Sequence, residues 1–329
     1  MRSLTALLCL QLKIIMLPRI LKKLYWKYYY LRSLWPVWFY ILNRHPRRLW
    51  QVYRPDVRLS AVQARVVGDL KRDGIAIAHL NDFFPEGSVT RELKAYSDKL
   101  LADPVSQEKI ATREHAKQTA KSDIIVHLLG GYGDTKHVLS LCNPFLRFTF
   151  SNEILHSVAS YFDMFPLFKM CSLHSTILLP AGSPEFFSQR WHRDPDDKKL
   201  VKVFLYLTDV EEQGAGPFTY IAGSHLGGKW RNLYPQVPPV GSYPPAGALE
   251  TYIPEADKKI CLGKIGTLIF CDTSGFHKGG YSTTKRRLMY AATYTSAASV
   301  LQANCTLIDM DKAGHFSRIA QYASGMTFL

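Results

Sequence analysis

The second half of the chain contains short segments rich in β-branched and aromatic residues, and this pattern limits the fold most strongly. Five segments are predicted as strands, at residues 167–179, 202–207, 216–221, 267–271 and 288–295. Turn signals such as Pro238-Pro239 and Pro244-Pro245 lie between them. Several short strands at this spacing favour an antiparallel sandwich or a jelly roll.

The first half instead has apolar residues at helical spacing. Helices are predicted at residues 60–72, 88–101 and 152–162, and one short strand at residues 74–80. Residues 103–122 are polar and lysine-rich, which predicts a mobile, solvated segment. Helices followed by strands indicate a mainly β fold with flanking helices, of the α+β class. We place its double-stranded β-helix, or jelly-roll, core at about residues 165–300.

The net charge of +14 is concentrated at the N-terminus. Residues 1–50 contain ten lysines and arginines and no acidic residue, which leaves +4 for residues 51–329. This segment also contains clustered aromatic residues, for example Tyr28, Tyr29 and Tyr30. We therefore divide the chain into a basic, aromatic N-terminal arm (residues 1–50) and one domain (residues 51–329).

Basic residues interleaved with aromatic rings suit the interface of an anionic membrane. No uncharged apolar run reaches the ~18 residues that a spanning helix needs. Peripheral membrane contact is the favoured interpretation, ahead of a helical arm packed on the domain or on a partner. A nucleic-acid surface is the least favoured alternative, although basic and aromatic residues also suit phosphates and bases.

The six cysteines are scattered and form no CxxC pair. This spacing argues against a disulfide framework and against a zinc site built from thiolates. A reducing, cytoplasmic location is expected, combined with peripheral membrane contact through the arm.

A candidate metal site begins at His192 and Asp194, in the run RWHRDPDD. Side chains two positions apart on a strand point to the same face, so one strand end could present both to one ion. His277 follows the predicted strand at 267–271 by a short turn. Two imidazoles and one carboxylate form the facial triad of non-haem Fe(II) oxygenases. A His-x-Asp pair alone is weak evidence, since His192 could be a turn residue and Asp194 a helix cap.

Arg287 follows His277 by ten positions and opens the last predicted strand. Its guanidinium could bind a dicarboxylate through two parallel hydrogen bonds. The neighbouring Arg286 is the alternative. Because side chains alternate along a strand, only one of the two arginines can face the site.

These segments together resemble the phytanoyl-CoA dioxygenase family of Fe(II)- and 2-oxoglutarate-dependent oxygenases. The resemblance rests on WHRD (191–194), VFLYLTDVEEQGAGPFTYIAGSH (203–225), GTLIFCDTSGFHKGG (266–280) and RRLMYAATYTS (286–296). DGIAIAHLNDFF (73–84) is similar to the strand that opens these domains. The chain departs from the family at Ala222, where proline is usual, and at Lys278-Gly279, where Gly-Ser is frequent.

The resemblance implies that His192, Asp194 and His277 bind Fe(II) and that Arg287 binds the distal carboxylate of the cosubstrate 2-oxoglutarate. It implies a dioxygenase that consumes O2, releases succinate and CO2, and hydroxylates an aliphatic C–H bond. Related halogenases lack the carboxylate ligand, so Asp194 favours hydroxylation. The substrate is expected to be a small molecule, or a lipid-like one that the arm would reach at a membrane.

Two other functions are weighed against this one. A non-catalytic jelly-roll binding protein would keep the fold without turnover, and a zinc hydrolase would need a general base beside the metal. Several other polar residues are interpreted structurally. His225 is expected to be a turn residue, His174 a hydrogen-bonded core histidine, Asp272 a turn former and Asp196 a poor substitute ligand.

Overall fold

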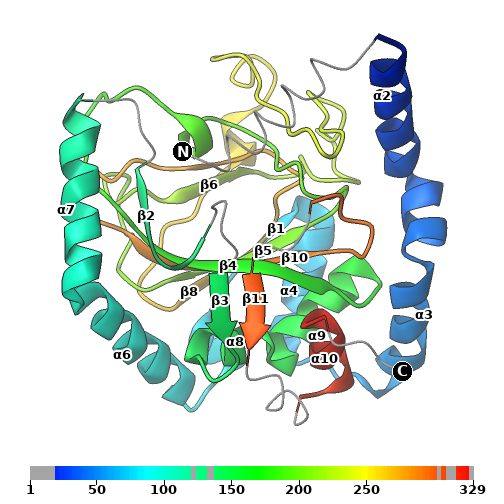
Figure 1. Cartoon of the computed structure of the whole chain (residues 1–329), viewed down its shortest axis with the longest axis horizontal. Helices are drawn as coiled ribbons and strands as arrows, with labels where there is room; N and C mark the ends of the chain where they lie inside the picture. The colour runs from blue at the N-terminus through cyan, green and yellow to red at the C-terminus, as the bar shows by residue number, and fades with distance from the viewer. Residues whose placement is uncertain (1–18, 120–123, 132–136, 302–304, 309–315, 326–329) are drawn as a thin grey trace.

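The computed structural model of the chain describes residues 19–119, 124–131, 137–301, 305–308 and 316–325. At its centre lies a six-stranded sheet in the order β1-β8-β5-β10-β4-β2 (Figure 1), in which all neighbouring strands are antiparallel. The strands are β1 (Ile75–His79), β2 (Ile125–Gly130), β4 (Leu167–Thr176), β5 (Val201–Tyr206), β8 (Thr267–Asp272) and β10 (Leu288–Thr295).

Two smaller sheets accompany it. One has the order β7-β6-β9, with β6 (Phe218–Ile221) between β7 (Lys258–Ile260) and β9 (His277–Gly279). The other pairs β3 (His137–Ser140) with β11 (Cys305–Ile308) in parallel. The five strands predicted in the second half are all present, while β2, β3, β7, β9 and β11 were not predicted from the sequence.

Residues of the large sheet alternate between two hydrophobic clusters, as a strand with two covered faces requires. Along β5, Val201, Val203 and Leu205 face the helices, whereas Phe204 and Tyr206 pack in a second cluster with Phe218 and Tyr220 of β6. The large and the three-stranded sheets therefore share an interior. This arrangement is a mixed α+β, jelly-roll-like core, and the full double-stranded β-helix topology stays a prediction.

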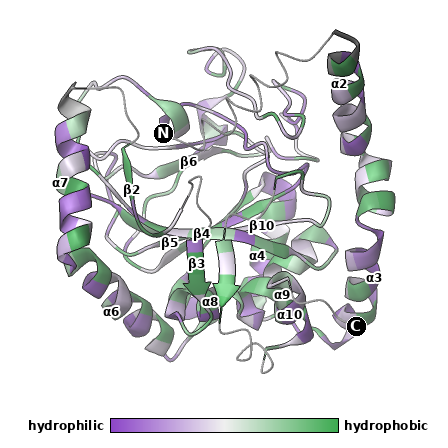
Figure 2. Cartoon of the chain, in the orientation of Figure 1, coloured by the Kyte–Doolittle hydropathy of each residue, from purple (hydrophilic) through white to green (hydrophobic). Residues whose placement is uncertain are grey.

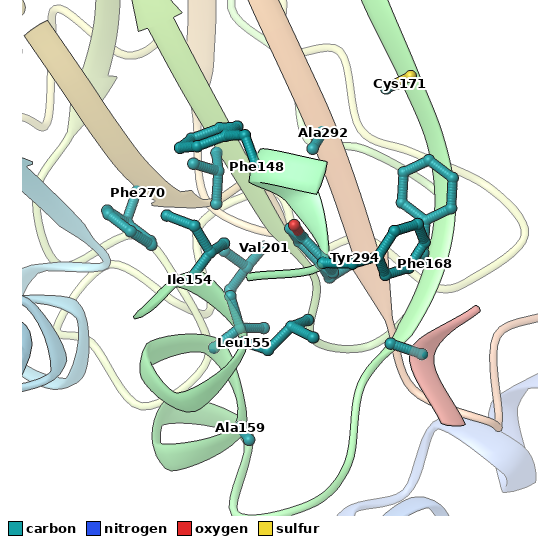
Figure 3. Close-up of a cluster of buried hydrophobic side chains, with 14 of the residues drawn as sticks. Phe148, Ile154, Leu155, Ala159, Phe168, Cys171, Val201, Phe270, Ala292 and Tyr294 are labelled. Atoms are coloured by element: carbon teal, nitrogen blue, oxygen red, sulfur yellow. The ribbon is translucent and has the colours of Figure 1, made fainter. Parts of the chain in front are cut away.

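Helices cover the other face of the large sheet. They include α4 (Ala61–Asp73), α5 (Leu80–Phe83), α6 (Ser88–Ala102), α8 (Pro144–Thr149), α9 (Asn152–Phe162) and α10 (Arg318–Ala323). Figure 3 shows Ile154 and Leu155 of α9 directed toward the sheet residues Val201 and Phe270. The helices predicted at 60–72, 88–101 and 152–162 are confirmed, and Ser60 and Gln63 form a capping box at the start of α4.

The prediction of a mobile, solvated segment at residues 103–122 is wrong for its described part. Residues Pro104–Thr119 form α7, and Asp103 accepts a hydrogen bond from Val105 N at 2.8 Å at its start. Ile110 is buried against Ile124 and Ile177. Ser106 is also buried, and Glu114 forms an ion pair with Arg286, so α7 is packed on the body. Residues 120–122 lie outside the described chain.

The N-terminal arm is helical where it is described, from residue 19 onward. It forms α2 (Arg19–Ser33), the π-helix η1 (Val37–Leu42) and α3 (Arg44–Tyr53). Trp38, Phe39 and Trp50 belong to the main hydrophobic core, so the second half of the arm packs on the domain. Among the described residues, no helix is long and apolar enough to cross a membrane. The division into an arm and one domain at residue 50 stays a prediction.

Candidate metal centre

Two segments far apart in the sequence pair directly at the site. His192 N donates to His277 O at 3.1 Å, and His277 N donates to His192 O at 3.0 Å. Asp194 N donates to Thr273 O at 2.9 Å, which continues the pairing. His277 is the first residue of β9, at the edge of the three-stranded sheet. This backbone pairing, which joins residues 85 positions apart, brings the predicted metal ligands together.

The side chains of His192, Asp194 and His277 are buried and offer ligand atoms that all lie within 4.8 Å of one another. His192 Nε2 lies 3.8 Å from Asp194 Oδ1, and His277 Nε2 lies 3.6 Å from Asp194 Oδ2. The two imidazole centroids are 4.1 Å apart. Among the described residues this is the one group of at least three histidine, cysteine or acidic side chains close enough to hold a metal ion.

Each imidazole is oriented by the backbone carbonyl two residues before it in the sequence. His192 Nδ1 lies 2.8 Å from Arg190 O, and His277 Nδ1 lies 3.0 Å from Gly275 O. A carbonyl oxygen only accepts, so each Nδ1 carries the proton and each Nε2 keeps its lone pair. Burial lowers the pKa of His192, and burial lowers the pKa of His277 well below its ordinary value. Both rings are therefore neutral near pH 7, as metal ligands must be.

Lys202 of β5 adds a cation to the site that the sequence analysis did not single out. Its Nζ lies 2.7 Å from Asp194 Oδ2, and both side chains are about nine-tenths buried. Burial raises the pKa of Asp194, but the neighbouring cation Lys202 holds it well below its usual value. Because both histidines are neutral, Lys202 is the charge that keeps the carboxylate ionised. A lone lysine in the apolar strand VKVFLY was the available sequence signal.

Arg193, between the two ligands, points to the opposite side and fixes the segment. Its guanidinium donates to four backbone carbonyls, among them Ser274 O at 2.7 Å and Leu233 O at 3.0 Å. It also lies 3.8 Å from the ring centroid of Phe276. These bonds tie the ligand segment to two loops, so the position of His192 and Asp194 is set by tertiary contacts.

Tyr243 covers one side of the site. Its ring stacks on His192 with centroids 5.3 Å apart and planes 11° apart. Tyr243 belongs to the loop at residues 227–254, and half of its own surface is exposed. The neighbouring Ser242 pairs with Arg193 through the backbone. The aromatic wall is therefore anchored to the ligand segment.

Arg286 and Arg287 point in opposite directions. Arg286 is partly exposed and binds Glu114 of α7 at 2.7 Å. Arg287 is buried, and its Nη1 donates to Gly216 O while its Nε has no hydrogen-bond partner among the described residues. An ideal Cβ on Gly279 would lie 3.8 Å from Arg287 Nη2. The guanidinium thus lies beside Gly279, two residues beyond His277 on β9 and about 7 Å along the strand.

The other polar residues have the positions that their structural interpretation predicts. His225 Nε2 lies 3.2 Å from Lys71 O, outside the triad. Asp196 pairs with the buried Lys169, and Asp272 accepts from Tyr161 Oη and from Ser274 N.

His174 is buried on β4, with its Nδ1 3.1 Å from Ser172 Oγ. Its Nε2 has no partner among the described residues, so only half of its hydrogen-bonding capacity is used. Arg287 and Lys202 are both close enough to lower its pKa further below the value that burial sets. His127, whose ring centroid lies 5.9 Å from that of His174, also lowers this pKa.

A cavity of about 400 Å³ lies away from the triad. It lies at one end of β4 and β10 and is lined by Leu167, Lys169, Thr295 and neighbouring residues. Its walls are mainly apolar and contain no member of the triad. The triad is therefore a candidate site because of its metal-binding geometry, not because of a cavity.

The sequence matches no protein-family model and no curated protein. Among solved structures, the epimerase SnoN of nogalamycin biosynthesis, described as non-heme and alpha ketoglutarate dependent, shares 16% identity at a TM-score of 0.46 and covers 74% of this chain and 86% of its own. EctD from S. alaskensis with bound Fe shares 16% identity at a TM-score of 0.48, and the match covers 77% of this chain and 82% of EctD. AviO1 from Streptomyces viridochromogenes Tue57 shares 15% identity at a TM-score of 0.43, and the match covers 75% of this chain and 99% of AviO1. Similarity at this level assigns no activity to the chain.

Proposed function

We propose that the chain is an Fe(II)- and 2-oxoglutarate-dependent dioxygenase that hydroxylates an aliphatic C–H bond. The observation that carries the proposal is the buried His192–Asp194–His277 set, in which both Nε2 atoms are unprotonated and directed to one carboxylate. Two imidazoles and one carboxylate suit ferrous iron and leave positions open for other ligands. The residues present therefore fit the metal that this reaction class requires.

The fit to 2-oxoglutarate rests on Arg287. This guanidinium is buried, has no carboxylate partner among the described residues, and carries an unpartnered Nε. Burial lowers its pKa, yet an arginine side chain stays protonated in proteins. A buried cation of this kind requires an anion. A five-carbon dicarboxylate has the length to join it to the region of His277, since Gly279 beside the guanidinium is two residues from His277 on β9.

When bound, Fe(II) and 2-oxoglutarate supply the oxidising chemistry, in which O2 and 2-oxoglutarate are converted to succinate and CO2 and one oxygen atom enters a substrate C–H bond. The chain supplies the rest. His192, Asp194 and His277 would hold the metal, Arg287 would hold the distal carboxylate, and Tyr243 would limit the access of water. Because Asp194 fills the third ligand position, we propose hydroxylation rather than halogenation.

The alternative functions find less support in these residues. A zinc hydrolase needs a general base beside the metal. The charged group nearest the triad is instead the cation Lys202, and Asp196 is already paired with Lys169. A non-catalytic binding protein would not require two neutral histidines and an ionised aspartate held in the protonation states that bind a metal.

We propose a small-molecule substrate, with a lipid-like one favoured because the arm exposes apolar and basic residues. The test is succinate release during incubation with fractionated pools of lipids, acyl thioesters and polar metabolites. Release that depends on a lipid or acyl fraction is expected. Release with the polar fraction alone would contradict the lipid-like assignment and leave the reaction class intact.

The reaction class is tested with purified protein under anaerobic conditions. Fe(II) with 2-oxoglutarate is expected to give a weak visible charge-transfer band, and admission of O2 is expected to give succinate. Asp194→Ala should abolish the band. His225→Ala, a buried histidine outside the triad, is the matched control and should keep it. Absence of both the band and succinate from the unmodified protein would refute the proposed function.

A further inference from the structure

The first half of the N-terminal arm carries an unpaired apolar surface. Leu21, Leu24, Tyr28 and Leu31 follow one another at intervals of three and four residues along α2 and therefore share one face of the helix. Their exposed fractions are 48%, 57%, 53% and 46%. Ten of the twenty exposed large apolar side chains of the described chain lie within residues 21–41. Such a concentration is typical of an interaction site.

The charge around this stripe has a single sign. Lys23 and Lys27 are exposed on α2, and no acidic residue occurs in the sequence before Asp56. Trp26 and Tyr30 are also exposed, so aromatic rings flank the leucines. Figure 2 shows hydrophobic and hydrophilic residues along α2, which lies at the edge of the molecule. Leucines, aromatic rings and lysines without acids on one helix match the interface of an anionic bilayer.

The second half of the arm fixes this helix to the domain at residues 51–329. Trp38 Nε1 donates to the buried Asp197 Oδ1 at 2.7 Å, and Asn43 Nδ2 donates to Ser296 Oγ at 3.0 Å. Arg32, near the end of α2, donates to Ala298 O at 3.0 Å. Asp197 is three residues beyond the ligand Asp194. The helix is thus held by the chain segments that follow the metal ligand and β10.

We propose that α2 is a docking surface for anionic lipid bilayers and lies in the membrane interface on its Leu21, Leu24, Tyr28 and Leu31 stripe. Charge decides among the possible occupants. The same three-and-four spacing would suit a second copy of the helix, but two copies rich in lysine and without acids would repel each other. A bilayer with anionic headgroups satisfies the apolar and the basic residues together. This surface is independent of the metal site.

The test is co-sedimentation of the full chain with vesicles of phosphatidylcholine alone and of phosphatidylcholine with phosphatidylserine at three to one. Binding only to the anionic vesicles, weakened at least about tenfold between low and high salt, is expected. Lys23→Gln with Lys27→Gln should weaken it about 30-fold, since each cation near the surface adds about fivefold to the affinity.

Leu24→Ser with Leu31→Ser tests the apolar stripe and should lower binding at least about tenfold. The matched control, Leu262→Ser with Val105→Ser, removes equally exposed apolar side chains elsewhere and should bind like the unmodified chain. Equal binding of the stripe and control variants would overturn the proposal. So would failure of the unmodified chain to bind anionic vesicles, or a concentration-dependent dimer in sedimentation equilibrium that the stripe variant abolishes.

Discussion

Lys202→Met would replace the ammonium that lies 2.7 Å from Asp194 Oδ2 by an apolar side chain of similar length. In metal-free protein the variant leaves Asp194 as a buried carboxylate without its cation. In the unmodified chain, burial lowers the pKa of both neighbouring histidines, so Lys202 is the cation that balances Asp194. The variant therefore separates two roles for Lys202, which could compete with the metal for Asp194 or orient the carboxylate toward it.

The expected magnitude follows from the burial of the pair. Removing one partner of a buried ion pair costs about 3–5 kcal/mol, because the other charge stays desolvated. An unfolding entropy of about 2.1 cal/mol/K per residue converts this into a loss of about 4–7 °C in the melting temperature. Lys94→Met is the matched control. It breaks an exposed pair with Asp98 on α6 and should cost at most about 1 kcal/mol.

Metal binding should restore the melting temperature that Lys202→Met loses in the metal-free state. An ion bound by Asp194 shares the carboxylate with Lys202, and like charges so close repel by several kcal/mol even at an effective dielectric constant near 20. We therefore expect Lys202→Met to bind Co(II) or Mn(II) at least about tenfold more tightly, with a larger metal-induced rise in melting temperature. Calorimetric titration and thermal melts measure both. A metal affinity lowered about 10- to 100-fold would refute this reasoning and make Lys202 an orienting partner.

Three further predictions concern the cosubstrate, the pH dependence and the arm. Arg287→Lys should raise the KM for 2-oxoglutarate about 10- to 100-fold, because a lysine cannot form the two parallel hydrogen bonds, whereas Arg286→Lys should leave it unchanged. Burial raises the pKa of Asp197 to about 6. The stability that protonated Asp197 contributes is therefore present at low pH and is lost as pH rises from about 4 through 6. Asp197→Asn should flatten the dependence of melting temperature on pH in that range. Trp38→Phe should cost about 1–3 kcal/mol, since it leaves a buried carboxylate oxygen short of one donor.

Each of these has an outcome that would contradict it. Equal KM values for the two arginine variants would remove Arg287 from the cosubstrate site. An unchanged slope between pH 4 and 6 in Asp197→Asn would mean that another group titrates there. A melting temperature of Trp38→Phe equal to that of the unmodified chain would show that the arm does not depend on the contact with Asp197.

The sequence alone predicted the main elements, because hydrophobic periodicity and turn residues act locally. Strand alternation also predicted that only one of Arg286 and Arg287 could face inward. Where the prediction failed, at residues 104–119, the burial of Ile110 and Ser106 and the ion pair of Glu114 with Arg286 distinguish a packed helix from a solvated segment. Burial of one side chain depends on what lies opposite it, and a local pattern contains no such information.

The sequence likewise supplied the residue types of the candidate site, since His192, Asp194 and His277 have the chemistry of metal ligands wherever they lie. Only the tertiary structure decided that they meet, through backbone hydrogen bonds between His192 and His277. It also placed Lys202 against Asp194 and Trp38 against Asp197. These are contacts between strands, loops and helices distant in the chain, whose geometry is set by sheet register and core packing rather than by neighbouring residues.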